Sequence, residues 1–149
     1  MKIPFQPLLA AALLAQGASA QAACPNAKAT IFSCTTAKAK VIEVCDLGQR
    51  MGYSFGPAGK PELALQVPRA QASTRQWEGI GRTISYSVDV PNGKTVYSVF
   101  WAADRMSDNH EISAGVEVVI NGKTAATVSC DPKKKIVQAM EGIDLKPTP

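Results

Sequence analysis

Apolar residues recur at every second position along most of this chain, from Thr30 onward. The clearest stretch alternates four apolar side chains with three polar ones: Ile84, Tyr86, Val88 and Val90 against Ser85, Ser87 and Asp89. Successive side chains of a β-strand point to opposite faces, whereas one face of a helix repeats about every 3.6 residues. The pattern therefore predicts half-buried β-strands for the body of the protein.

The sequence Pro91–Asn92–Gly93 joins two such segments, Ile80–Val90 and Val96–Ala102, into a hairpin. Proline presets a φ angle that turns use, and glycine accepts the positive φ angle that a tight hairpin requires. The sequence is compatible with a loop of two residues or of three, and this choice moves the register by one. It decides which side chains face the core: Tyr97, Val99 and Trp101, or Val96 and Phe100.

Three further pairs of segments have the same character: Val116–Ile120 with Lys123–Cys130 across Asn121–Gly122, Ile31–Thr36 with Lys40–Cys45, and Met51–Phe55 with Leu63–Val67. Four hairpins make about eight short strands. Short antiparallel strands joined by Gly/Pro turns are typical of small barrels and sandwiches. The sequence therefore predicts an all-β domain, either a small antiparallel barrel or a sandwich.

One short helix is predicted at the C-terminal end. Asp131 suits the N-cap, Pro132 suits the first helical position and Gly142 suits the C-cap. The tripeptide Lys133–Lys135 would lie in the first turn, and we interpret it as a solvated face. Apolar residues recur at helical spacing over this segment: Ile136, Met140 and Ile143.

The first twenty residues have the pattern of a secretory signal peptide. Lys2 precedes an apolar run from Leu8 to Ala15, and the small residues Ala18–Ser19–Ala20 suit cleavage after Ala20. The run is shorter than the roughly 20 residues that a membrane span requires. The sequence therefore predicts a signal peptide over residues 1–20 and a single domain over residues 21–149. This domain would lie in the periplasm or outside the cell, with no membrane span.

The composition and the charge distribution argue against two classes of protein. Apolar residues make up 46% of the 149 residues, and the formal net charge is only +4, falling to +3 when Lys2 leaves with the signal peptide. Such a chain is too apolar and too weakly charged to be disordered. The basic residues Arg69, Arg75 and Arg82 are scattered and not interleaved with aromatic residues. Nucleic-acid binding is therefore not expected.

Four cysteines, an even number, predict two disulfides in an oxidising compartment. The preferred pairing joins Cys34 to Cys45 across a hairpin and Cys24 to Cys130 at the ends of the domain. The alternative joins Cys34 to Cys130 and Cys24 to Cys45. Zinc is not expected, because there is no C-x2-C pair. Lipidation of Cys24 is not expected either, because Gln21 stands where a lipobox has leucine.

The chain shows no catalytic set. Gly52–Gly56 matches the G-x-S-x-G motif, with Ser54 in the place of the nucleophile, but that motif requires a helix after the serine. Here Pro57 and Pro61 follow instead. His110 is the only histidine, which excludes a multi-histidine metal site. We interpret the protein as non-enzymatic, without cofactor or metal.

Two segments carry the candidate binding residues. Trp77–Arg82 places an aromatic and an arginine, the types that dominate binding hot spots, around Gly81, which permits unusual backbone angles. Asp104–Glu111 is a polar connector that contains His110. The alternatives are core packing for Trp77 and a solvated connector around His110.

Several short motifs between Thr30 and Asp131 resemble a group of small secreted proteins of Gram-negative bacteria. They are Ile31–Cys34, Val44–Asp46, Gly79–Arg82, Tyr86–Gly93 and Val128–Cys130. The resemblance implies a location in the cell envelope and nothing about activity. More remotely, the domain resembles the periplasmic lysozyme inhibitors, whose Ser-Gly-Arg-x-Tyr loop enters the lysozyme cleft. Gly81 and Arg82 match the glycine and the arginine of that loop.

Together these features predict a periplasmic binding or inhibitor protein that acts on a cell-wall hydrolase, including an immunity role against a toxin. The alternative is a non-enzymatic β-domain of the envelope with a structural or small-ligand-binding role. Exposure of Trp77, Arg82 or His110 on a projecting loop would favour the first.

Overall fold

The computed structural model describes residues 24–26 and 28–149, so the predicted signal peptide lies outside the described residues. These residues form eleven β-strands and one short 3₁₀ turn, η1. Their bounds are β1 Thr30–Thr35, β2 Lys40–Asp46, β3 Arg50–Pro57, β4 Leu63–Pro68, η1 Arg69–Gln71, β5 Ser73–Arg75, β6 Thr83–Asn92, β7 Thr95–Asp104, β8 Ile112–Ile120, β9 Lys123–Ser129, β10 Val137–Gln138 and β11 Lys146–Pro147. Within this part of the chain, no helix is long and apolar enough to cross a membrane.

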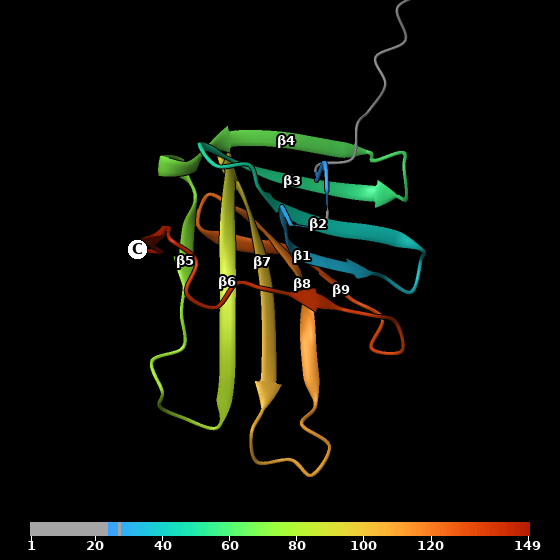
Figure 1. Ribbon diagram of the computed structural model, residues 1–149, viewed down its shortest axis with the longest axis vertical. Coiled ribbons are helices and arrows are strands. Elements are labelled where there is room, and N and C mark those ends of the chain that lie inside the picture. Colours follow the sequence, from blue (N-terminus) through green and yellow to red (C-terminus); the bar gives the residue numbers. More distant parts are fainter. Residues whose placement is uncertain (1–23, 27) are drawn as a thin grey trace, which may run out of the picture.

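The strands form two sheets that pack face to face as a sandwich, which confirms the all-β prediction and decides between its two forms. The smaller sheet has the order β10-β1-β2-β3-β4, and the larger has the order β11-β5-β6-β7-β8-β9. All neighbours are antiparallel except β11, which runs parallel to β5. Figure 1 shows the long strands β6–β8 running across the direction of β1–β4.

All four predicted hairpins are present: β1–β2, β3–β4, β6–β7 and β8–β9. In β8–β9 the turn residues Asn121 and Gly122 both have positive φ, at 51° and 76°, as a type I′ turn requires. In β6–β7 Asn92 pairs with Thr95, so the loop has two residues, and its first residue, Gly93, has a φ of 62°.

This two-residue loop settles the register of β7. Val99 is fully buried, and Tyr97 and Trp101 pack against the core from the same strand. Tyr97 stacks on the buried Tyr53 of the smaller sheet, with 4.7 Å between the ring centroids. Further fully buried side chains fill the space between the sheets: Phe32, Ile42, Val44, Met51, Val88, Val90, Val116 and Met140.

Two disulfides are present, but the preferred pairing was wrong and the alternative is correct. Cys34 bonds to Cys130, and Cys24 bonds to Cys45. Cys34 points into the core from β1, whereas Cys45 lies one residue after the inward-pointing Val44 and therefore faces the other side of its sheet. Across the β1–β2 hairpin, Cys34 thus has Ile42 and not Cys45 as its partner.

The predicted C-terminal helix is absent from the described residues. Asp131 begins a turn, in which its backbone oxygen accepts a hydrogen bond from the Lys134 amide, and the chain then runs extended. Val137–Gln138 adds to the edge of the smaller sheet beside β1 as β10. The Cys34–Cys130 bond brings this segment to an open sheet edge, and pairing there satisfies its backbone groups while Met140 still reaches the core.

Candidate functional site: the loop tip of the larger sheet

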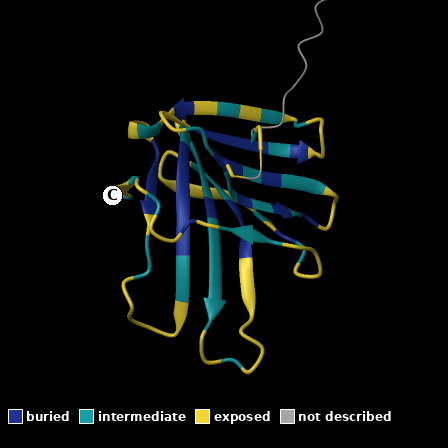
Figure 2. Cartoon of the chain, viewed as in Figure 1, coloured by how far each residue is buried: buried dark blue, intermediate teal, exposed yellow. Residues whose placement is uncertain are grey.

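Two loops meet at one end of the larger sheet. Thr83 at the start of β6 pairs with Asp104 at the end of β7, and Ala103 pairs with Ile112 at the start of β8. The β5–β6 and β7–β8 connections therefore lie side by side, and we call residues 76–82 and 104–112 the loop tip. Figure 1 shows β6–β8 extending past the smaller sheet toward this end, where Figure 2 shows mostly exposed residues.

Arg105 fastens the two loops together. Its guanidinium lies 5.0 Å from the centroid of the Trp77 ring, and its Nη1 donates a hydrogen bond to the Gly81 carbonyl at 3.2 Å. Its backbone N–H donates to the Arg82 carbonyl at 3.0 Å. The Trp77 indole N–H in turn donates to the Ile80 carbonyl at 2.9 Å, which closes its own loop. Three of the predicted binding residues thus share one small network.

Arg82 and Asp104 form an ion pair next to this network. Arg82 Nε lies 2.9 and 2.8 Å from the two carboxylate oxygens, and its Nη2 donates to Oδ2 at 2.6 Å. These hydrogen bonds from Arg82, followed by one from the Met106 amide, lower the pKa of Asp104 to about 2. Arg82 is therefore engaged by a carboxylate of its own chain, although 65% of its side chain is exposed.

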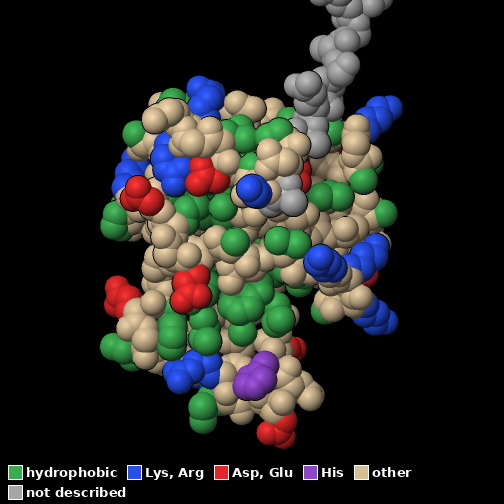
Figure 3. Space-filling view, in the orientation of Figure 1, with side chains coloured by type: hydrophobic (Ala, Val, Ile, Leu, Met, Phe, Trp, Pro, Cys, Tyr) green, Lys and Arg blue, Asp and Glu red, His purple; other side chains and the backbone are tan. Residues whose placement is uncertain are grey.

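The β7–β8 loop has internal hydrogen bonds that define its shape. Asp104 Oδ1 accepts the Met106 amide at 2.8 Å, and Ser107 Oγ accepts the Glu111 amide at 3.0 Å. The His110 amide donates to the Ser107 carbonyl at 3.1 Å, and His110 has a φ of 45°. His110 is exposed on this loop, and it is the purple residue at the lower end of Figure 3.

Three large apolar side chains are exposed on the loop tip. Ile80, Met106 and Ile112 expose 82%, 73% and 45% of their surface. The fourth large hydrophobic residue found exposed in the described part of the chain, Ile120, lies at the opposite end of β8 and exposes 42%. Burial of such residues in the core would stabilise the fold, so three of them on one projecting end make the loop tip the candidate interaction surface.

The loop tip carries more negative than positive charge, in contrast to the basic chain as a whole. Its two arginines are both held by contacts within the tip. Four carboxylates accompany them: Glu78, Asp104, Asp108 and Glu111.

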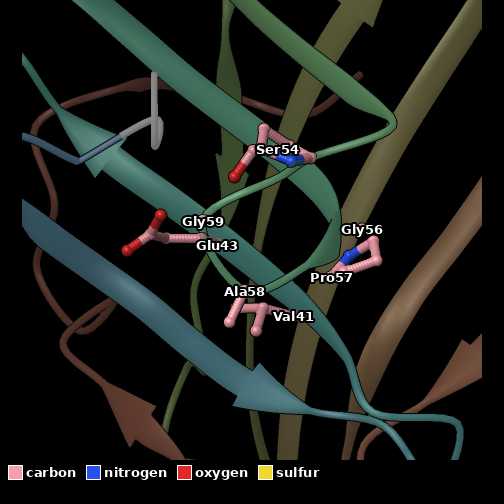
Figure 4. A pocket seen from close by; sticks show the side chains of 8 residues that line it. Val41, Glu43, Ser54, Gly56, Pro57, Ala58 and Gly59 are labelled. Atoms are coloured by element: carbon pink, nitrogen blue, oxygen red, sulfur yellow. The ribbon is translucent and has the colours of Figure 1, made fainter. Parts of the chain in front are cut away.

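A second candidate place lies on the outer face of the smaller sheet, where the loop after β3 folds over a pocket of about 190 Å³. Ser54 and Glu43 lie there on paired strands, as Figure 4 shows. Burial raises the pKa of Glu43, against the effect of a hydrogen bond from the Cys24 amide. Ser54 lies within strand β3, and no helix follows it, so the surroundings differ from those of a hydrolase nucleophile.

The sulfur atoms of Cys24 and Cys45 lie within 4.8 Å of a Glu43 carboxylate oxygen. Both sulfurs are bonded to each other in a disulfide, so they are not thiolate ligands for a metal ion.

The sequence singled out Trp77, Gly81, Arg82 and His110, and the structure places all four on the loop tip. Trp77 is half-buried and packs against the core, as its alternative interpretation had it. The sequence did not single out Arg105, Ile80 or Met106 as residues of the candidate site. The register of the β6–β7 hairpin could have indicated Arg105. With a two-residue loop at Gly93–Lys94, continuing the pairing along β6 and β7 places Arg82 opposite Arg105.

Comparison with protein families, curated proteins and solved structures finds no significant match to this chain.

Proposed function

We propose that this protein is a periplasmic or secreted, non-enzymatic binding protein that contacts a partner protein through the loop tip. The partner that we propose is a cell-wall hydrolase, which the protein inhibits, either for its own cell or as immunity against a rival's toxin. The observation that carries the proposal is the group of three exposed apolar side chains on the loop tip: Ile80, Met106 and Ile112.

The internal contacts of the tip support this role. Arg105 and the Arg82–Asp104 pair join the two loops, and the Ser107 hydrogen bonds hold the β7–β8 loop in shape. A loop that is ordered before binding loses less conformational entropy when the partner arrives. The exposed apolar residues can then fill pockets of the partner as anchors, while the surrounding charges form a polar rim.

The net charge of the loop tip indicates the charge of the partner's surface. Because the tip has four carboxylates and two arginines, a complementary surface would carry an excess of positive charge around the apolar contact. The compartment is supported by the two disulfides, which are typical of proteins that mature in an oxidising environment.

The test is inhibition of a panel of lysozymes and other muramidases by the protein from residue 21 onward. A double variant, Ile80→Ser with Met106→Ser, should weaken inhibition by about tenfold or more, the scale of an interface hot spot. Its melting temperature should stay unchanged, because both side chains are exposed. Ile120→Ser is the matched control and should inhibit like the wild type.

If the wild type inhibits none of these enzymes, the hydrolase is the wrong partner class. If inhibition occurs but the double variant inhibits as well as the control, the loop tip is the wrong surface.

A further inference from the structure

A pocket of about 380 Å³ lies at the seam between the two sheets, away from the loop tip. One side is formed by the β1–β2 turn and β3 of the smaller sheet, and the other by the C-terminal end of β9 in the larger sheet. The sheets are joined beside it by the Thr36–Cys130 bridge and the Cys34–Cys130 disulfide. The volume lies at the lower end of the range for small-molecule sites.

The pocket has apolar walls from both sheets. Phe55 of β3 and Val128 of β9 are half-buried and pack against the core, and Ala37 is exposed at the turn. β9 is the last strand of its sheet, so the backbone on its outer side has no neighbouring strand. Such an edge offers N–H groups that a ligand can use.

The two lysines of the pocket differ in their charge balance. Lys40 Nζ lies 2.9 Å from a Glu62 carboxylate oxygen and 5.3 Å from the centroid of the Phe55 ring. Its charge is therefore compensated. Lys38 is exposed, and none of the ion pairs found among the described residues includes it. Lys38 thus supplies an uncompensated positive charge next to an apolar surface.

Further positive charge lies on the neighbouring segment. The Asp131 amide donates to the Thr35 carbonyl at 2.8 Å, which brings Lys133–Lys135 beside the end of β1. In Figure 3 blue side chains gather on the right-hand side, where Figure 1 shows the β1–β2 turn and the segment after β9.

We propose that this seam pocket binds a small anionic amphiphile, with its apolar chain against Phe55 and Val128 and its anionic group at Lys38. A purely inorganic anion would leave the apolar walls unused. A neutral amphiphile would leave the charge of Lys38 without a partner. An amphiphile with one anionic group satisfies both parts of the pocket. This proposal does not depend on the loop tip.

The test is calorimetric titration with decyl phosphate below its critical micelle concentration. Inorganic phosphate and decyl maltoside serve as the comparison ligands, one with the charge alone and one with the chain alone. Decyl phosphate should bind about tenfold or more tightly than either, because a charge-assisted hydrogen bond and apolar burial add together. Binding of decyl phosphate no tighter than inorganic phosphate would overturn the proposal.

Variants locate the site. Lys38→Ala should weaken decyl phosphate binding by about tenfold, and Ala37→Trp should block it by filling the mouth of the pocket. Lys94→Ala is the matched control, because Lys94 lies in the β6–β7 turn at the opposite end of β9, where its carbonyl accepts the Asn121 amide. The proposal is wrong if Lys38→Ala binds like Lys94→Ala. It is also wrong if the protein binds vesicles of mixed zwitterionic and anionic phospholipid but not monomeric decyl phosphate, because a lipid surface would then be the ligand.

Discussion

At the scale of residues, the stabilising effect of the Arg82–Asp104 ion pair depends on pH in a defined way. The folded-state pKa of Asp104 is about 2, below its ordinary value of 3.8. A carboxyl with a depressed pKa contributes stability that is fully present above its unfolded value and is lost as the pH falls toward 2. The pair is exposed to solvent, so its effect is local and holds the loop tip in shape more than it stabilises the fold.

Replacing Arg82 should therefore raise the pKa of Asp104 toward 3.8, since the hydrogen bonds from Arg82 are the main cause of its depression. Carbon-detected NMR titration of the aspartate carboxyl in Arg82→Ala measures this. Arg75→Ala, at the exposed end of β5, is the control and should leave the titration unchanged. An Asp104 pKa that stays near 2 without Arg82 would contradict the ion pair.

The residue types of the tip were readable from the sequence, but their contacts were not. Trp77, Gly81 and Arg82 are neighbours in the chain, so one segment pointed to them. Arg105 contacts residues more than twenty positions away in the chain. Its position could be predicted only from the hairpin register, which the turn sequence left open. Local patterns indicate which residues are unusual, whereas long-range pairing decides what they touch.

At the level of elements, Gly56 shows how one residue shapes the loop between β3 and β4. Its φ is 144°, and a Cβ there would collide with the Glu62 amide nitrogen and lie 2.8 Å from Pro61 Cα. The Glu62 amide also donates to the Phe55 carbonyl at 2.9 Å. The loop folds tightly back on its own strand, and only glycine leaves room for this.

Gly56→Ala should lower the free energy of unfolding by about 3 kcal/mol, because backbone atoms must move to relieve the contact. Gly59→Ala in the same loop is the matched control. Gly59 has a φ of 71° with open space around it, so only the backbone strain of about 1 kcal/mol applies. Urea denaturation measures the free energy of unfolding of both variants. Equal losses for Gly56→Ala and Gly59→Ala would contradict the packing of this loop.

The hairpins were predictable because two local signals agree in each of them, strand alternation and a turn that accepts positive φ. The C-terminal helix failed for a physical reason. The spacing of Ile136, Met140 and Ile143 suits a helix, but an extended chain with turns also delivers these side chains to the core. The edge of β1 offers the extended chain backbone hydrogen bonds, which form when it pairs there as β10. This tertiary pairing overrides a modest local preference for a helix.

At the scale of the whole molecule, the two disulfides constrain the chain unequally. Cys34–Cys130 spans 96 positions and links the two sheets, whereas Cys24–Cys45 spans 21 and fastens the N-terminal segment to the outer face of the smaller sheet. In the chain-entropy description, a longer closed loop restricts the unfolded state more.

The double variant Cys34→Ala with Cys130→Ala should therefore lose about 5 kcal/mol of the free energy of unfolding. The double variant Cys24→Ala with Cys45→Ala should lose about 3 kcal/mol. Urea denaturation of the two double variants gives the order, and peptide mapping of the unreduced wild type gives the pairing itself. Peptides joined as Cys34–Cys45 would contradict the fold.

The whole molecule presents two separate surfaces of different chemistry, an apolar and acidic loop tip and a lysine-bordered pocket at the sheet seam. The tip is built from two loops that the pairing of β6, β7 and β8 brings side by side, and the pocket is built from segments of both sheets. The tip is the surface that carries the proposed function, since three of the four exposed large hydrophobic residues found in the described chain lie there.

The most direct test of that claim is site-specific photo-cross-linking in living cells. A photoreactive phenylalanine derivative replaces Ile80 on the loop tip or, as the matched position, Ile120 at the far end of β8; both side chains are exposed. The account predicts a cross-linked species containing a cell-wall hydrolase from position 80 and none from position 120. The same cross-linked partner from position 120, or no cross-link from position 80, would contradict it.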